Sequence, residues 1–137
     1  MPTTIKILLI EDDGDDVELL QEALNNNNVH YEMEVLNDGS EAIEFVKNCS
    51  KYPHIIVMDY NLPKVHGKEV LKQIKATTQL KDIPLVVLTT SSSKTDMEYA
   101  YEMGADKFLI KPITMAEMKI TTNTIQNIAL LYKQKSN

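Results

Sequence analysis

Four short apolar runs in this sequence each end on residues that can do chemistry. These runs, with the residues that follow them, are 55–58 with Asp59, 5–10 with Glu11, Asp12 and Asp13, 85–88 with Thr89 and Thr90, and 108–110 with Lys111. Short β-prone runs of this kind are typical of buried strands. In open parallel sheets ligands bind at the carboxyl ends of the strands. We therefore expect acids, a hydroxyl group and a cation to gather at one sheet edge.

The acids at this edge form a candidate metal site. Carboxylates that converge repel one another, which raises their pKa values unless a cation lies between them. Mg²⁺ suits Glu11, Asp12 and Asp59 because it accepts one or two carboxylates and keeps water or phosphate oxygens as other ligands. Taken alone, the segment 11–13 could equally cap a helix and face solvent. An acid that ends a buried strand, as Asp59 does, needs a partner.

Lys111 is the cation that the same edge would offer. A lysine in this place can pair with a carboxylate or with an incoming phosphoryl group. Taken alone, Lys111 is more often a surface lysine, and Thr89 is weak evidence because threonine is common in strands. The sequence leaves open whether the Lys111–Pro112 bond is cis.

The elements that would position these residues alternate between strand and helix. Strands are predicted over 5–10, 31–36, 55–59, 85–88 and 107–110. Helices are predicted over 15–25, from the cap 38–40, over 67–76, from the serines 91–93 to Gly104, and over 114–133. Strict βα alternation predicts an α/β fold in which a doubly wound parallel sheet carries helices on both faces.

The composition narrows the class of protein. The 137 residues fit one domain, 1–137, with no output domain, and 43% hydrophobic with 25% charged residues is ordinary for a globular protein. A net charge of −6 argues against nucleic-acid binding. The single Cys49 fits a reducing compartment. No apolar run approaches the ~20 residues that cross a bilayer, and no secretion signal is visible, so we expect a cytoplasmic protein.

The order of these motifs resembles the receiver domain of two-component response regulators, from Ile5 to about Lys133. The matching motifs are Leu8-Leu9-Ile10-Glu11-Asp12-Asp13, Met58-Asp59-Tyr60-Asn61-Leu62-Pro63 with Gly67, Leu88-Thr89-Thr90, and Gly104-Ala105 followed by Lys111-Pro112. The chain is also similar to small stand-alone regulators that include phytochrome-associated ones. The resemblance implies a flavodoxin-like sheet of five strands in the order 2-1-3-4-5.

The resemblance also implies a role for each residue at the sheet edge. Asp59 would accept a phosphoryl group from a histidine kinase or a histidine phosphotransfer protein. Asp12 would bind Mg²⁺ directly, Glu11 would hold it through water, and Asn61 would offer its backbone carbonyl, with Asp59 as a further ligand. The phosphoryl-binding and switch residues would be Thr89, Thr90, Lys111 and Phe108.

Phosphorylation would then act as a switch. It adds about −1.5 to −2 charge at this edge. Thr89 would move toward the phosphoryl oxygens, and the vacated space would let Phe108 turn inward. The fourth helix, fifth strand and fifth helix would carry the signal to a downstream protein partner or to a second copy in a homodimer. No enzyme activity is expected beyond self-assisted phosphorylation and dephosphorylation.

Three other classes of protein share part of this pattern. A pseudo-receiver would bind proteins without being phosphorylated. A Mg²⁺-dependent phosphohydrolase of the haloacid-dehalogenase type also uses an Asp nucleophile, but here only Glu11-x-Asp13 matches its acid pattern and no cap insertion is present. A flavin-binding domain would need a phosphate-binding loop rich in Ser, Thr or Gly after the first strand.

Overall fold

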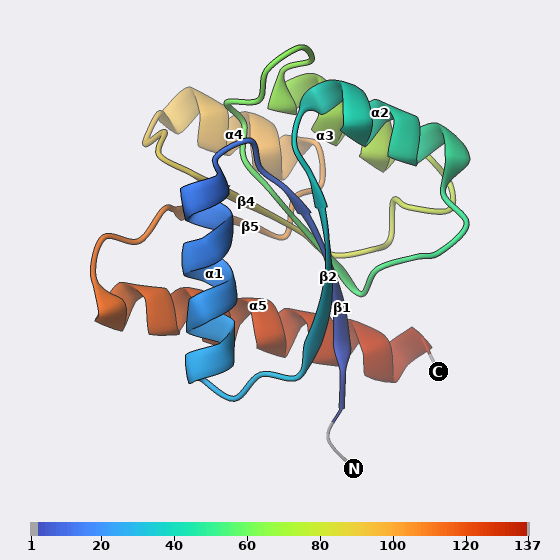
Figure 1. Ribbon diagram of the computed structural model, residues 1–137. Helices are drawn as coiled ribbons and strands as arrows, with labels where there is room; N and C mark the ends of the chain where they lie inside the picture. Colours follow the sequence, from blue (N-terminus) through green and yellow to red (C-terminus); the bar gives the residue numbers. More distant parts are fainter. Residues whose placement is uncertain (1–2, 137) are drawn as a thin grey trace.

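A five-stranded parallel sheet lies at the centre of the protein, in a computed structural model that describes residues 3–136 (Figure 1). The strands are β1 (Ile5–Ile10), β2 (Tyr31–Leu36), β3 (Ile55–Met58), β4 (Leu85–Thr89) and β5 (Lys107–Ile110). The helices are α1 (Gly14–Asn26), α2 (Gly39–Asn48), α3 (Gly67–Ala76), α4 (Lys94–Glu102) and α5 (Met115–Ser136). The strand order β2-β1-β3-β4-β5 confirms the predicted doubly wound fold.

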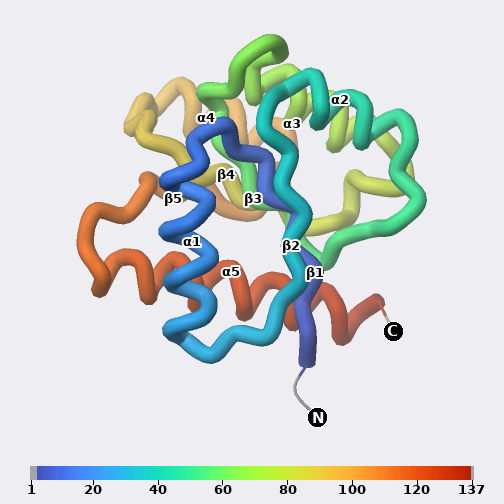
Figure 2. Tube along the Cα trace, in the orientation of Figure 1, coloured from blue at the N-terminus to red at the C-terminus, as the bar shows by residue number. Residues whose placement is uncertain are grey.

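Two layers of helices bury the two faces of the sheet. Helices α1 and α5 cover one face, and α2, α3 and α4 cover the other (Figures 1 and 2). Successive side chains of a strand point to opposite faces. Leu8 therefore packs in the same core as Leu71 of α3, whereas Leu9 packs in the same core as Leu24 of α1. Burial on both faces is why the central strands are apolar throughout.

Polar side chains cap the helices where the sequence predicts helix starts. The Asp38 carboxylate accepts a hydrogen bond from the Glu41 amide at 2.8 Å, and the Ser93 hydroxyl accepts one from the Asp96 amide at 3.3 Å. Such caps satisfy backbone donors that have no partner inside the helix. Gly104 follows α4 with φ of 104°, a left-handed conformation that glycine adopts without strain.

Helix α5 extends to Ser136, beyond its predicted end near Lys133. The Lys133 Nζ donates a hydrogen bond to the Thr4 carbonyl oxygen at 2.6 Å, which ties the end of α5 to the chain just before β1. Among the helices in residues 3–136, none combines the length and the hydropathy needed to span a bilayer.

The loop between β3 and α3 packs closely on the start of α2. The Gly39 amide donates to the Pro63 carbonyl oxygen at 3.1 Å. A Cβ atom added at Gly39 would lie 1.9 Å from the Val65 carbonyl oxygen. The absence of a side chain at Gly39 therefore allows this loop, which also contains Asn61, to approach α2.

We expect Gly39→Ala to destabilise the fold by about 1–3 kcal/mol, because the backbone of the β3–α3 loop must shift. Gly14 is also the first residue of a helix, but nothing lies within 4 Å of its added Cβ. Gly14→Ala should therefore leave the stability unchanged or raise it by up to about 1 kcal/mol. Urea unfolding of both variants measures the difference, and equal stabilities would contradict the close approach at Gly39.

Candidate functional site

The register of the sheet places Glu11 beside Asp59. Ile10 of β1 is paired with Met58 of β3, and each is followed by one of the two acids. The Asp59 amide donates to the Ile10 carbonyl oxygen at 3.1 Å. The backbone of the two strands therefore brings both acids to the same carboxyl edge, as the sequence predicts.

The register of β4 and β5 adds the hydroxyl group and the cation. Thr89 is paired with Ile110, the residue before Lys111. The Lys111 amide donates to the Thr89 carbonyl oxygen at 2.8 Å. Residues at the ends of four strands thus meet at one edge, which confirms the predicted gathering.

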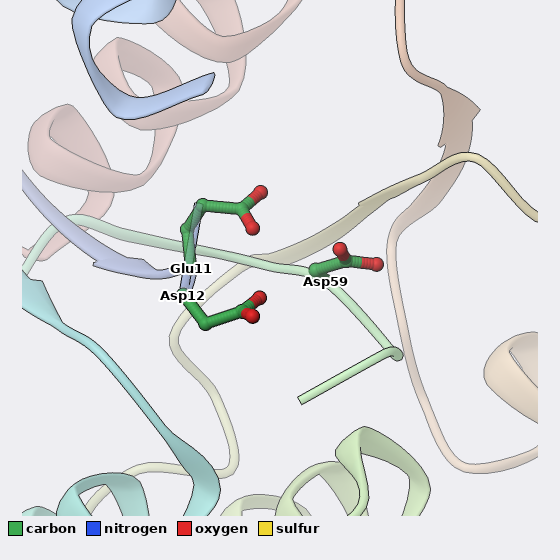
Figure 3. A group of neighbouring side chains, drawn as sticks. All are labelled: Glu11, Asp12 and Asp59. Atoms are coloured by element: carbon green, nitrogen blue, oxygen red, sulfur yellow. The ribbon is translucent and has the colours of Figure 1, made fainter. Parts of the chain in front are cut away.

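Three carboxylates form an oxygen cluster at this edge. Glu11, Asp12 and Asp59 each contribute an oxygen atom, and these atoms lie within 4.8 Å of one another. Figure 3 shows Glu11 and Asp12 extending from the chain after β1 toward the side on which Asp59 lies. Glu11 and Asp59 are buried, whereas Asp12 is exposed. An all-oxygen set with one solvent-exposed member fits a hard divalent cation that keeps part of its water.

The Lys111 ammonium group pairs with three carboxylates. Its Nζ lies 3.0 Å from Asp59 Oδ2, as expected, and 2.8 Å from Glu11 Oε1. A third contact, 2.6 Å to Asp16 Oδ2, was not predicted. The sequence indicates only that Asp16 lies near the start of a helix, where a negative charge interacts favourably with the helix dipole. The peptide bonds of residues 3–136 are all trans, including Lys111–Pro112.

Burial and charge act against each other in this cluster. Burial raises the pKa of Glu11, and the hydrogen bond and charge of Lys111 oppose that rise. Burial alone would lower the pKa of Lys111, but hydrogen bonds to Asp16, Glu11 and Asp59 hold it above its usual range. One lysine faces more than one carboxylate, so the edge keeps an excess of negative charge.

The other predicted site residues differ in exposure. Thr89 is fully buried, and its Oγ1 accepts a hydrogen bond from the Ser91 amide at 3.3 Å. Thr90, the next residue in the chain, is exposed, so the two threonines lie in different environments. Asn61 is exposed too, and its backbone N–H donates a hydrogen bond to Asp59 Oδ1 at 3.2 Å.

Phe108 is already buried in this structure. Its ring packs edge-on against Tyr60, with 5.9 Å between ring centroids. Its amide donates to the hydroxyl of Tyr101 at 3.1 Å. The inward turn expected on phosphorylation therefore has no outward starting point here, because the ring already packs in the core on the α2, α3 and α4 side of the sheet.

An ion pair that the sequence does not predict holds the loop after β4. Lys68 Nζ lies 2.6 Å from Asp96 Oδ1, and the Ser91 hydroxyl donates to Asp96 Oδ2 at 2.7 Å. The same ammonium lies 5.5 Å from the ring centroid of Tyr99. These contacts join α3, α4 and the loop that follows Thr89. The sequence shows the serines only as a helix cap, because pairing between two helices depends on tertiary packing.

A doubly wound sheet with acids and a lysine at its carboxyl edge is the arrangement that the sequence motifs led us to expect. A sequence model of the response regulator receiver domain matches residues 7–123. The chain belongs to this family.

Two relatives show how far the similarity extends. The chain is 38% identical to the response regulator Rcp1 of Synechocystis sp., over 82% of this chain and 80% of Rcp1. It is 36% identical to the probable methanogenesis regulatory protein FilR2 of Methanothrix harundinacea, over 88% of this chain and 80% of FilR2. Both alignments cover most of each protein.

Solved structures agree with the sequence comparison. The phosphorylated cyanobacterial phytochrome response regulator RcpA superimposes with a TM-score of 0.84 at 34% identity, covering 93% of this chain and 95% of RcpA. The Mn²⁺-bound form of Rcp1 superimposes with a TM-score of 0.79 at 36% identity, covering 88% and 91% of the two chains. The likeness to phytochrome-associated regulators predicted from the sequence is thereby confirmed.

The ion pair at Asp96 predicts a pH dependence of stability. Hydrogen bonds from Lys68 and Ser91 lower the pKa of Asp96 below 3.8. A lowered folded-state pKa contributes stability above the unfolded value that is lost as pH falls through the folded value. We expect Asp96→Asn to lower the free energy of unfolding by about 0.5–1 kcal/mol at neutral pH. This difference should shrink as the pH falls below 3.8.

Urea unfolding across this pH range measures the effect. Glu98→Gln removes the same charge from α4, where Glu98 makes only an exposed contact of 3.8 Å with Lys94. A stability loss that is the same for both variants, or independent of pH for Asp96→Asn, would contradict the pairing.

Proposed function

We propose that this protein accepts a phosphoryl group on Asp59 from a histidine kinase or a histidine phosphotransfer protein, with Mg²⁺ bound at the acid cluster. Membership of the receiver family supports the proposal. The observation that carries it is local: Asp59 lies 3.0 Å from Lys111 and within 4.8 Å of the acids Glu11 and Asp12. A nucleophilic carboxylate, a fixed cation and a set of metal ligands are together what phosphoryl transfer to an acid requires.

The transfer needs no separate general base. A carboxylate oxygen of Asp59 forms a bond to phosphorus while the bond from phosphorus to the imidazole nitrogen of the donor breaks, and the electron pair leaves with the imidazole. Both reactants are anionic, so the main barrier that the protein lowers is charge repulsion. Lys111 reduces that repulsion from its place beside Asp59. A bound Mg²⁺ would supply further positive charge against the phosphoryl oxygens.

The proposed roles of the acids follow their exposure. Asp12 is exposed and is the proposed direct ligand of Mg²⁺. Glu11 is buried and hydrogen-bonded to Lys111, which supports a role through water rather than direct coordination. Asn61 would add its backbone carbonyl, since it follows Asp59 by two residues and already hydrogen-bonds to it.

On the phosphoryl side, Lys111 and Thr89 are the proposed partners of the phosphoryl oxygens. The Thr89 hydroxyl, whose oxygen accepts a hydrogen bond from the Ser91 amide, would donate a hydrogen bond to a phosphoryl oxygen. Thr90 is an exposed neighbour that could contact the group only from outside. Movement of Thr89 would disturb the loop that Ser91 and Asp96 hold.

The proposed output surface is formed by α4, β5 and α5. β5 is an edge strand, and Ile110 on it is 49% exposed. Tyr101 on α4 and Ile120 on α5 are exposed as well. The hydrogen bond between the Phe108 amide and the Tyr101 hydroxyl connects this surface to the buried switch residue. A downstream protein or a second copy of the chain would bind there.

The test of the acceptor role is incubation with acetyl phosphate and Mg²⁺. We expect intact mass spectrometry to find one added phosphate on the wild-type chain and none on Asp59→Asn. Asp13→Asn is the control, because asparagine caps a helix as well as aspartate does and the variant should still be modified. An unmodified wild type, or equal labelling of Asp59→Asn, would contradict the proposal.

Divalent cations should stabilise the folded protein. At a concentration a hundred times Kd, binding contributes about 2.7 kcal/mol, which thermal unfolding with and without Mg²⁺ or Mn²⁺ detects as a rise in Tm. Asp12→Asn should lose most of this rise and be slightly more stable than wild type without metal, because one repulsion is removed. Asp15→Asn removes the same charge from an exposed residue of α1, and this variant should keep the metal-dependent rise in Tm. Equal rises in both variants would place the metal elsewhere.

A further inference from the structure

The Lys111 ammonium pairs with three carboxylates: it donates hydrogen bonds to Asp16 and Asp59, and it forms an ion pair with Glu11. The partners are Asp16 at 2.6 Å, Glu11 at 2.8 Å and Asp59 at 3.0 Å. Glu11 and Asp59 come from strand ends, but Asp16 comes from the first turn of α1. The shortest of the three contacts therefore involves a residue outside the strand-end cluster.

Asp16 also differs from the other two partners in its exposure. Its side chain is 33% exposed, whereas those of Glu11 and Asp59 are 5% and 6% exposed. Water can solvate the Asp16 oxygens that do not face the lysine. The contact between Asp16 and Lys111 therefore does not depend on the buried carboxylates at the strand ends, and it can persist while the charge on Asp59 changes.

A lysine needs such a partner because its side chain is flexible. The four-carbon stem carries about 2 kcal/mol of rotamer entropy, and the ammonium is a point charge without a preferred direction. The surrounding cavity offers little to replace Asp16, since Leu19, Pro112 and Met118 form its apolar wall beside Lys111. If Asp16 is lost, one donor of Lys111 has only water as a partner.

We propose that Asp16 is a positioning residue for phosphoryl transfer. Its hydrogen bond, together with the ion pair to Glu11, holds the Lys111 ammonium so that another N–H donor points at Asp59 and at the phosphoryl group that arrives there. During transfer this last hydrogen bond passes from the Asp59 oxygen to a phosphoryl oxygen, and the contacts with Asp16 and Glu11 persist. The inference rests on the proposed function, since it assigns Asp16 a part in that reaction.

A role for Asp16 in positioning Lys111 and a role through its charge alone predict different outcomes for substitutions at Asp16. If Asp16 acted only through its charge, its removal would favour an anionic phosphodonor and would resemble removal of any nearby acid. Asp15 is the matched control: it precedes Asp16 in the same helical turn, carries the same charge and is exposed. Asp16→Asn removes the charge but keeps an amide oxygen that accepts a hydrogen bond from the ammonium.

The experiment compares Asp16→Ala, Asp16→Asn and Asp15→Ala with wild type in acetyl phosphate and Mg²⁺. We expect Asp16→Ala to be phosphorylated about three- to tenfold more slowly, Asp16→Asn to recover most of the rate, and Asp15→Ala to match wild type. A second measurement needs no phosphodonor: NMR relaxation of the Lys111 side chain should show larger motion in Asp16→Ala and unchanged motion in Asp15→Ala. Thermal unfolding confirms that each variant is folded.

Three results would overturn the inference. The first is an Asp16→Ala rate equal to or above that of wild type, and the second is the same change in all three variants. The third is unchanged Lys111 motion in Asp16→Ala. A wild-type chain that is never phosphorylated would contradict the proposed function instead, while the relaxation measurement would still decide whether Asp16 restrains Lys111.

Discussion

The ammonium group of Lys111 forms ion pairs with carboxylates that would otherwise repel one another. Glu11 and Asp59 are buried at strand ends, and an unpaired buried charge costs several kcal/mol. Contacts of 2.8 and 3.0 Å to one lysine offset that cost. The neutralisation is incomplete, because Asp12 lies in the same cluster and Asp16 shares the same lysine. The remaining negative charge favours a divalent cation, and in the proposed function that cation would let an anionic phosphodonor approach.

This charge cluster depends on the register of the sheet. A slip of one residue between β1 and β3 would turn every side chain of the strand to the opposite face. Leu8 and Leu9 pack in separate cores, so such a slip would exchange the side chains that the two cores contain. The strand register therefore sets the spacing of the residues at the strand ends, and the geometry of the site depends on that register. The loops that adjoin the site are held by local contacts, such as the hydrogen bond from Gly39 to Pro63.

The parts of the structure that the sequence predicts are those with a periodic or ordered signal. Continuous apolar runs indicate strands buried on both faces, and the residues that end them, such as Asp59 and Lys111, follow directly from the chain. The contact of Asp16 with Lys111 has no such signal, because it depends on how α1 is rotated against the sheet. The pairing of Lys68 with Asp96 depends in the same way on the packing of two helices. Likewise, the burial of Phe108 depends on tertiary packing, including its edge-on contact with the Tyr60 ring.

The chemistry proposed for the acid cluster is tested most directly by locating the modified residue. Borohydride converts an aspartyl phosphate to homoserine, which peptide mass spectrometry identifies by position. After incubation with a phosphohistidine donor or acetyl phosphate in Mg²⁺, we predict homoserine at position 59, and none when the metal is chelated. Homoserine at another position, or an intact Asp59 under these conditions, would contradict the assignment of Asp59 as the phosphoryl acceptor.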